Sequence, residues 1–263
     1  MHVYRPICVA AMLCGLATAA LADVTIPGVP YYPWYHGCGP TAGGMITGYW
    51  DSNGFGNLIP GSNDWSTNQA AIETMIASPE HIADYWGADR VPPPPLHADD
   101  CVADFMHTSR GPYADGYSPF SMQDNGLVGY AEYCGYLGST ALNTTYDEND
   151  SWADDTYWNA FLAEIDAGRP VELYADSDAD GNADHFVTAY GYDLGAKQYI
   201  CHDPSSPGQK RYDFTRNAPG QAFGLRGSTS FTPVPEPATV ALLALGGLPL
   251  LTRAGGRRRK RNA

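Results

Sequence analysis

Two short apolar segments, one near each end of the chain, limit what the rest of the sequence can fold into. The first runs from Ile7 to Ala20 and the second from Val240 to Leu251. Both are short for a permanent membrane-spanning helix, which needs about 20 apolar residues. We therefore expect the folded part of the protein to lie between them, from Asp23 to Thr232. These 210 residues are enough for one domain with its own hydrophobic core.

Residues 1–22 have the features of a secretory signal peptide. Arg5 supplies a positive start, the apolar run follows, and Ala20-Leu21-Ala22 has the small residues of a cleavage site. The alternative is an N-terminal membrane anchor, for which the run is short. We predict that the mature chain begins near Asp23 and is exported from the cytoplasm.

Residues 233–263 contain three parts in a fixed order. Pro235-Glu236-Pro237 comes first, the apolar segment follows, and a basic cluster ends the chain at Arg257-Arg258-Arg259-Lys260-Arg261. The positive charges would keep the tail on the cytoplasmic side of a membrane. The alternative is an ordinary C-terminal membrane helix.

This three-part order resembles the PEP-CTERM sorting signal of Gram-negative bacteria, which exosortases process. The resemblance implies an exosortase-type processing enzyme as a partner. It also implies membrane attachment through the C-terminal segment until processing, and a final location at the cell envelope or extracellular surface.

The charge of the central region excludes one class of partner. Between Asp23 and Thr232 there are eight Lys and Arg residues against 28 Asp and Glu residues. Nucleic-acid binding depends on Lys and Arg neutralising phosphates, so we exclude it. With 44% hydrophobic residues, the chain is also too apolar to be disordered.

The spacing of apolar residues changes along the domain. Three- and four-residue spacing predicts helices beginning at Cys38 and over residues 68–77, 126–136 and 151–168. A two-residue period then predicts strands over residues 171–174, 186–192 and 198–201. Because helices precede strands, we expect an α+β domain rather than a doubly wound one.

Cysteine usage leaves the redox state open. Cys8 and Cys14 lie in the predicted signal peptide, so the mature chain keeps four cysteines: Cys38, Cys101, Cys134 and Cys201. Two disulfides are the default expectation for an exported protein. If Cys38 is a free nucleophile, one disulfide and one buried thiol remain. The sequence does not choose the pairing.

Cys38 is the first candidate for chemistry. It lies in Gly37-Cys38-Gly39-Pro40-Thr41, at the start of the first predicted helix. The N–H groups and dipole of a helix N-terminus favour the thiolate, which is the nucleophilic form of cysteine. The same N–H groups can hold an oxyanion. The alternative for Cys38 is half of a disulfide.

Two further positions can serve a thiol nucleophile. His185 begins a predicted strand, and a neutral imidazole is the natural base for a thiol. Asp203 ends the next strand, so a hairpin of the two strands would bring its carboxylate to His185 and orient the ring. His202 and His36 are rival candidates.

Four short segments together resemble a known family. They are Val29-Pro-Tyr-Tyr, Gly37-Cys-Gly-Pro-Thr-Ala, His185-Phe-Val-Thr-Ala-Tyr-Gly-Tyr and His202-Asp-Pro. They are similar to the bacteriocin-processing (double-glycine leader) cysteine peptidases of the papain-like superfamily.

The resemblance implies a papain-like fold over residues 23–232, with a helical half that carries the nucleophile and an antiparallel sheet in the C-terminal half. It implies that Cys38 is the nucleophile, His185 the general base and Asp203 the residue that orients it. It also implies a peptide or protein substrate and no required cofactor.

One departure from the family pattern leaves two hypotheses for the function. The family carries a Gln about six residues before the Cys, whose amide completes the oxyanion hole. This chain has Tyr32 there and no Gln from Asp23 to Cys38. Tyr32, Trp34 or His36 would have to replace it, and losing one donor costs about 10²–10³ in rate. The chain is thus a cysteine peptidase-like hydrolase or, alternatively, a catalytically inactive homologue that acts as a surface binding or structural protein.

An acidic loop precedes His185. Oxygen-bearing side chains alternate over residues 176–184, with Gly181 at the sixth place, as in the first half of a calcium loop. Val187 stands at the twelfth place, where such loops carry a bidentate Glu. The candidate Ca²⁺ ligands are Asp176, Asp178, Asp180, Asn182 and Asp184. The alternative is an ordinary acidic turn.

Overall fold

A computed structural model of the chain describes residues 23–87, 97–147 and 152–235. Its helices are α1 (Cys38–Ser52), α2 (Trp65–Ile76), α3 (Pro79–Tyr85), α4 (Val102–Phe105), the 3₁₀ turn η1 (Phe120–Met122), α5 (Gln123–Tyr133) and α6 (Thr156–Asp166). Its strands are β1 (Val24–Thr25), β2 (Thr140–Thr145), β3 (Val171–Asp176), β4 (His185–Asp193), β5 (Gln198–Asp203), β6 (Ser206–Asp213) and β7 (Gly224–Thr232).

The strands form one seven-stranded sheet in the order β2-β7-β3-β4-β5-β6, with the short β1 paired to β4. Every strand pair is antiparallel. The last strand, β7, therefore lies between β2 and β3 inside the sheet. The expected α+β class is confirmed, although β2 comes before α6 and so interrupts the simple order of helices first and strands second.

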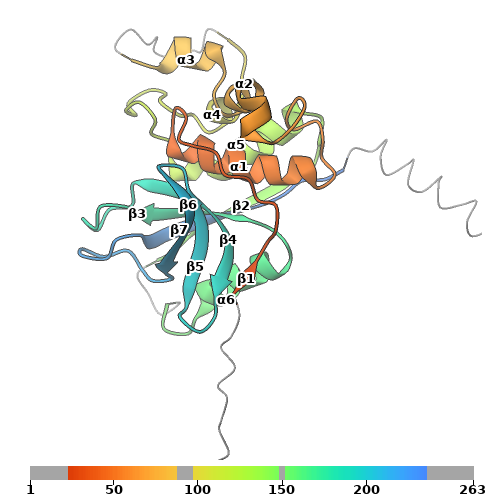
Figure 1. The fold of residues 1–263 in the computed structure, drawn as a ribbon. Coiled ribbons are helices and arrows are strands. Elements are labelled where there is room, and N and C mark those ends of the chain that lie inside the picture. The colour runs from red at the N-terminus through yellow and green to blue at the C-terminus, as the bar shows by residue number, and fades with distance from the viewer. Residues whose placement is uncertain (1–22, 88–96, 148–151, 236–263) are drawn as a thin grey trace, which may run out of the picture.

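Helices cover the sheet from two sides. Figure 1 shows α1 to α5 gathered on one side of the sheet, with α6 at the other end of the molecule. The Thr188 hydroxyl of β4 donates to the carbonyl of Ala42 in α1 at 2.8 Å, and the Tyr49 hydroxyl of α1 donates to the carbonyl of Gly168 at 2.8 Å. These bonds fix α1 across the sheet.

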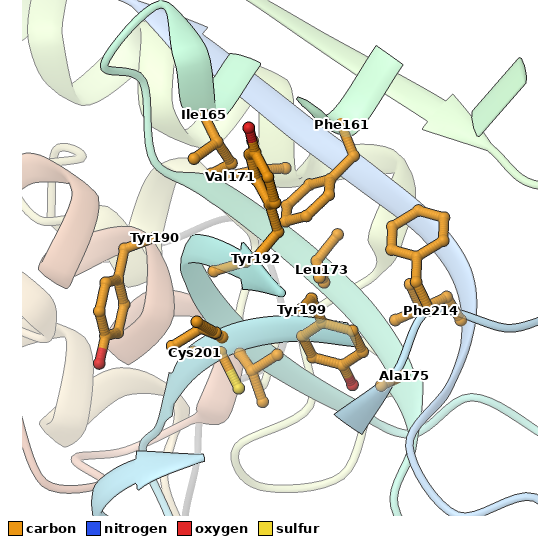
Figure 2. Packing of buried hydrophobic residues seen from close by; sticks show 14 of the residues in the cluster. Phe161, Ile165, Val171, Leu173, Ala175, Tyr190, Tyr192, Tyr199, Cys201 and Phe214 are labelled. Atoms are coloured by element: carbon orange, nitrogen blue, oxygen red, sulfur yellow. The ribbon is translucent and has the colours of Figure 1, made fainter. Parts of the chain in front are cut away.

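The two halves have separate hydrophobic cores. In the first core, Phe161 and Ile165 of α6 pack against sheet residues such as Leu173 and Tyr199, as Figure 2 shows. The second core lies among α1, α2, α4 and α5. Partly buried Trp50 of α1 packs against both cores, so α1 is the element that joins them.

Glycines in α1 allow its neighbours to come close. A Cβ on Gly43 would lie 2.6 Å from the Met106 side chain, and one on Gly44 would lie 2.8 Å from the Ile76 side chain. Glycine weakens an isolated helix. In α1 that cost is offset by close packing against the helices around it.

The predicted elements are present with shifted ends. The helix expected over residues 68–77 begins at Trp65, because the Asp64 carboxylate accepts from the Ser66 N–H at 2.9 Å and caps it. The helix expected over residues 151–168 is α6, which begins later, at Thr156. Strands β2, β6 and β7 are not predicted from the sequence, because polar residues, and in β6 and β7 also glycine, obscure the alternating pattern.

The disulfides expected as the default are wrong. Cys38, Cys101, Cys134 and Cys201 are all free thiols. Cys101 and Cys201 are fully buried and belong to different cores, so packing keeps these two apart.

The predicted signal peptide (residues 1–22) lies outside the described residues, as does the predicted sorting signal from residue 236 onward. None of the helices in the described ranges combines the length and apolar character that crossing a membrane requires.

The contact between α5 and α4 gives a test of the packing. A Cβ on Gly126 would lie 2.2 Å from the Met106 side chain and 3.2 Å from its Cα. We expect Gly126→Ala to lower the free energy of unfolding by about 1–3 kcal/mol, because overpacking outweighs the gain in helix propensity. Urea denaturation measures this. Gly56→Ala is the matched control, since its Cβ would meet no atom within 4 Å; equal stability of the two variants would contradict the packing described.

Candidate active site

Cys38 is the first residue of α1 and is partly exposed. A tight turn fixes it there: the Thr41 hydroxyl donates to the carbonyl of Gly37 at 2.6 Å and accepts from the Tyr35 N–H at 3.0 Å. Gly37 has φ 148°, and a Cβ at this position would lie 3.0 Å from the carbonyl oxygen of Gly116. The turn therefore requires glycine before the thiol.

His185 and Asp203 lie together, as the predicted hairpin implies. His185 begins β4 and Asp203 ends β5, and these strands pair antiparallel. The His185 Nε2 is 2.8 Å from Asp203 Oδ1. This leaves Nδ1 as the ring nitrogen that can face a thiol.

The His185 ring also interacts with Cys38. Burial alone would lower the pKa of His185, but hydrogen bonds with Asp203 and Cys38, and the charges of both, raise it to about 10. The three predicted residues are thus brought into one chain of contacts, Cys38 to His185 to Asp203. Their catalytic roles stay predictions.

Asp203 is held as a carboxylate by its partners. Burial would raise its pKa, but the hydrogen bond from His185 and one from the Ser205 N–H lower it. The Ser205 N–H donates to the same Oδ1 at 2.8 Å. A charged Asp203 in turn favours a protonated His185.

The rival histidines lie elsewhere. His202 packs on Tyr190, with ring centroids 4.4 Å apart, and its Nε2 lies 3.2 Å from the carbonyl of Val29. His36 is enclosed by Tyr35 and Trp86, each with ring centroids at 4.6 Å. Burial lowers the pKa of both His202 and His36. Of the three histidines, His185 is the one whose ring interacts with Cys38.

Tyr32 does not reach the site. It is fully buried, and its hydroxyl donates to the carbonyl of Asn63 at 2.9 Å. A Cβ on Gly48 would lie 2.2 Å from this hydroxyl. Gly48 is ten residues along α1 from Cys38, or about 15 Å. Tyr32 therefore cannot replace the family's oxyanion Gln, and Trp34 is the nearby alternative.

A cavity of about 300 Å³ lies beside Cys38. Its walls come from the loop before α1, from the 114–118 segment and from strands β3 and β4. The lining residues are Trp34, Cys38, Ala114, Asp115, Gly116, Tyr117, Ser118, Tyr174, Asp184 and Phe186. A larger cavity, of about 460 Å³, lies near the acidic loop and does not include Cys38.

Two features of the site are missed by the sequence analysis. The 114–118 segment has no motif of its own, yet it forms much of the cavity wall, and a Cβ on Gly39 would lie 2.9 Å from the Ser118 hydroxyl. Glu172 of β3 is fully buried, and neither of its carboxylate oxygens has a hydrogen-bond partner. Burial and the charge of Cys38 raise the pKa of Glu172 well above its usual value.

The acidic loop brings together part of the predicted calcium set. Ligand oxygens of Asp176, Asp178 and Asp180 lie within 4.8 Å of one another. Asp184 is not in this group: its carboxylate accepts from the Ser177 N–H at 2.8 Å and the Ser177 hydroxyl at 3.1 Å. The loop therefore brings three of its four predicted carboxylate ligands to one point.

Residues 26–227 match the model of the Peptidase_C39 like family. A search of curated proteins returned no match.

The buried Glu172 predicts a pH dependence of stability. Because its folded pKa is raised, the unfolded chain releases this proton from about pH 4.3 upward while the folded chain keeps it. Stability from this group is thus lost as pH rises, by at most about 1.4 kcal/mol per pH unit. The amide that Glu172→Gln introduces has no such proton. The free energy of unfolding of this variant, relative to that of the parent protein, should therefore increase from pH 4.5 to pH 7.

Urea denaturation at the two pH values, with the exposed Glu132→Gln as control, measures this difference. A Glu172→Gln variant that follows the parent at both pH values would show that Glu172 ionises normally.

Proposed function

Because this chain belongs to the Peptidase_C39 like family, we propose that it is a cysteine peptidase that cleaves peptide or amide bonds through Cys38, His185 and Asp203. The observation that carries the proposal is the contact chain at the mouth of α1. The His185 ring interacts with Cys38 and, at 2.8 Å, with Asp203 beside a cavity that opens onto the thiol.

The chemistry follows from the charges. His185 takes the proton of the Cys38 thiol, and its raised pKa favours the imidazolium that results, so the thiolate is the attacking form. The thiolate attacks the substrate carbonyl carbon and forms a tetrahedral intermediate. His185 then donates its proton to the leaving amine, and an acyl-enzyme remains. Water, deprotonated by His185, hydrolyses the thioester and restores Cys38.

The oxyanion of the tetrahedral intermediate needs hydrogen-bond donors. The first N–H groups of a helix have no intrahelical partner, so the Cys38 N–H at the start of α1 is one donor. Trp34 lines the cavity with Cys38 and carries an indole N–H, so we assign it as the second donor in place of Gln.

The cavity indicates the kind of peptide that fits. Aromatic rings of Trp34, Tyr117 and Phe186 line it together with the carboxylates of Asp115 and Asp184, and no Lys or Arg of the described part of the chain takes part. Apolar and basic substrate side chains are therefore favoured over acidic ones next to the cleaved bond.

Export and attachment complete the proposal. Residues 1–22 act as the signal peptide. Residues 233–263 act as a PEP-CTERM-type signal that an exosortase-type enzyme processes, which places the domain at the cell envelope or extracellular surface of a Gram-negative bacterium. The support is the sequence pattern alone.

The acidic loop is proposed as a weak Ca²⁺ site built on Asp176, Asp178 and Asp180, which would hold the segment before His185. Ca²⁺ at about 100 times its Kd should raise the free energy of unfolding by about 2.7 kcal/mol. Thermal denaturation with and without Ca²⁺ tests this. The exposed Asp178→Asn variant should lose the response, and an unchanged transition in the parent protein would rule the site out.

A catalytically inactive homologue, acting as a surface binding or structural protein, is the second candidate. The specific observation that favours it is the buried Tyr32 at the position of the family's Gln, far from Cys38.

The first test is alkylation of Cys38. Brief iodoacetamide treatment at pH 7 should modify Cys38 at least roughly ten times faster than Cys134, because His185 stabilises its thiolate. Cys134 is the internal control: it is also partly exposed, and burial raises its pKa. Peptide mass spectrometry locates the adduct, with Cys38→Ala as the blank. Equal rates at the two cysteines would support the inactive homologue.

The second test concerns the role of Asp203. Its contact with His185 raises the pKa of the ring, so Asp203→Asn should lower that pKa. The alkaline limb of kcat/KM for peptide hydrolysis, set by the proton on His185, should then move from near pH 10 to lower pH. His185→Ala should reduce kcat by about 10²–10⁴. An alkaline limb that stays in place in Asp203→Asn would remove Asp203 from the proposed mechanism.

A further inference from the structure

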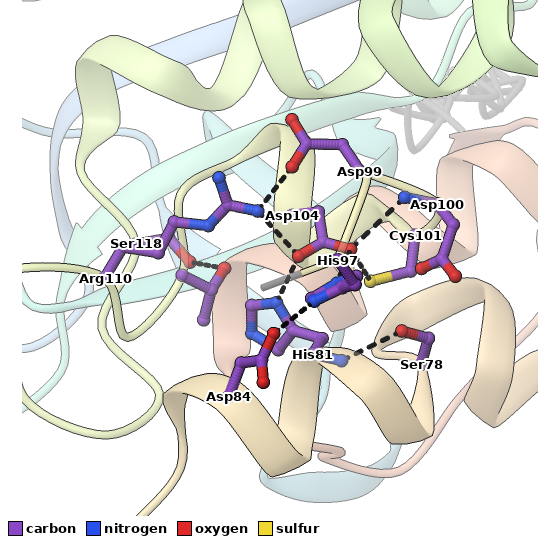
Figure 3. Close-up of polar contacts among 11 residues, drawn as sticks. Ser78, His81, Asp84, His97, Asp99, Asp100, Cys101, Asp104, Arg110 and Ser118 are labelled. Carbon is purple, nitrogen blue, oxygen red and sulfur yellow. Dashed lines mark hydrogen bonds and ion pairs between the residues drawn. The ribbon is translucent and has the colours of Figure 1, made fainter. Parts of the chain in front are cut away.

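A second polar cluster is buried in the helical half, among α3, α4 and the segment that precedes α4. Figure 3 shows it around Asp104, which is fully buried. We call it the Asp104 cluster; its members are His81, Asp84, His97, Asp99, Asp100, Cys101, Asp104 and Arg110. None of these residues lines the cavity beside Cys38.

Metal-ligating atoms of three kinds converge on the Asp104 carboxylate. His81 Nδ1 is 2.7 Å from Oδ1, while His97 Nε2 and Cys101 Sγ are each 3.1 Å from Oδ2. In a tetrahedral zinc site with bonds of about 2.0–2.3 Å, neighbouring ligand atoms lie roughly 3.3–3.6 Å apart. A cation among these atoms would need to move His97 and Cys101 away from the Asp104 carboxylate by roughly 0.2–0.5 Å, and His81 by roughly 0.6–0.9 Å.

The ligand atoms also group without reference to hydrogen bonds. Those of His81, Cys101 and Asp104, all buried, lie within 4.8 Å of one another. Those of His97, Asp100 and Asp104 form a second group of the same kind. Asp104 belongs to both groups, while His97 shares only Asp104 with the first, so binding of one ion by all four residues requires the His97 ring to move toward His81 and Cys101.

His97 has the orientation of a metal ligand. Its Nδ1 lies 2.6 Å from Asp84 Oδ2, while its Nε2 faces the Asp104 carboxylate. Metal-bound histidines almost always donate their other ring N–H to a carboxylate or carbonyl, which fixes the tautomer and turns the free nitrogen to the metal. Asp84 supplies that carboxylate.

Charge and unsatisfied atoms point the same way. The cluster contains four carboxylates, from Asp84, Asp99, Asp100 and Asp104, and a single permanent cation, Arg110. Three of its buried polar atoms, His81 Nε2, Asp100 Oδ1 and Arg110 Nε, have no hydrogen-bond partner. Buried anions require compensation, and a divalent cation supplies two charges in one place.

We infer that His81, His97, Cys101 and Asp104 bind a divalent transition-metal ion, and that Zn²⁺ is the best match. A thiolate, two imidazoles and a carboxylate suit Zn²⁺ rather than Ca²⁺, which takes oxygen ligands only. Four protein ligands, three of them buried and His97 partly so, make the site structural.

The site holds α3 against α4. Trp86, the residue after α3, packs on two aromatic rings near Cys38: its ring centroid is 4.6 Å from that of His36 and 6.1 Å from that of Trp34. Through Trp86, the metal site therefore stabilises the position of Trp34 in the wall of the cavity beside Cys38.

The experiment uses the full chain carrying Cys38→Ala, so that the thiol of the first site cannot bind metal. Zinc is removed with a chelator, Co²⁺ is added, and the absorption spectrum is recorded. We expect a thiolate-to-cobalt charge-transfer band that saturates at about one Co²⁺ per chain and disappears when Zn²⁺ displaces the cobalt. Cys101→Ser should abolish the band, while the matched Cys134→Ser should keep it.

A second variant with a milder change is needed, because Cys101→Ser could lose the band by failing to fold. Asp84→Asn leaves all four ligands in place and removes the carboxylate behind His97, so it should weaken Zn²⁺ binding by about 10- to 100-fold in a chelator competition. A charge-transfer band that persists in folded Cys101→Ser would overturn the site. So would a chain with Cys101 intact that shows no band with Co²⁺; the cluster would then be a hydrogen-bonded network balanced by protonated histidine.

Discussion

The contact between α1 and β4 is the constraint on which the proposed active site depends. Cys38 and Ala42 lie one turn apart on α1, while His185 and Thr188 lie on the same strand. The buried hydrogen bond from Thr188 to Ala42, at 2.8 Å, therefore fixes the helix over the strand and with it the distance from thiol to imidazole. The thiol and the imidazole come from different halves of the fold, so their relative position depends on how the two halves pack. Trp50, which packs on both cores, stabilises the same contact between the halves.

Two buried carboxyl groups near the Cys38 thiol, those of Asp203 and Glu172, have opposite pKa shifts. Asp203 is stabilised as an anion by the His185 ring and the Ser205 N–H. Glu172 has no such partner, and burial beside Cys38 keeps it protonated. A second full negative charge at Glu172 would oppose the thiolate, so a neutral carboxyl there is compatible with a charged Cys38.

The parts of the site that the sequence could predict are those fixed by local patterns. Cys38 follows from a glycine-flanked helix start, and the meeting of His185 with Asp203 follows from two short strands joined as a hairpin. Glu172, the wall at residues 114–118 and the Asp104 cluster depend on residues far apart in the chain, for which periodicity carries no information. The disulfide expectation failed because it rested on compartment statistics, whereas the cores keep Cys101 and Cys201 apart. Tyr32 stands six residues before Cys38 in the sequence, but its side chain lies against Gly48, far along α1 from the thiol.

The place of β7 in the sheet has a consequence for how the chain reaches its native state. The strand nearest the C-terminus pairs with both β2 and β3, and among the described strands β2 pairs only with β7. The sheet therefore stays open until almost the whole domain has left the ribosome, and its closure brings together residues as far apart as Thr140 and Thr232. Such a topology has a high contact order and folds slowly.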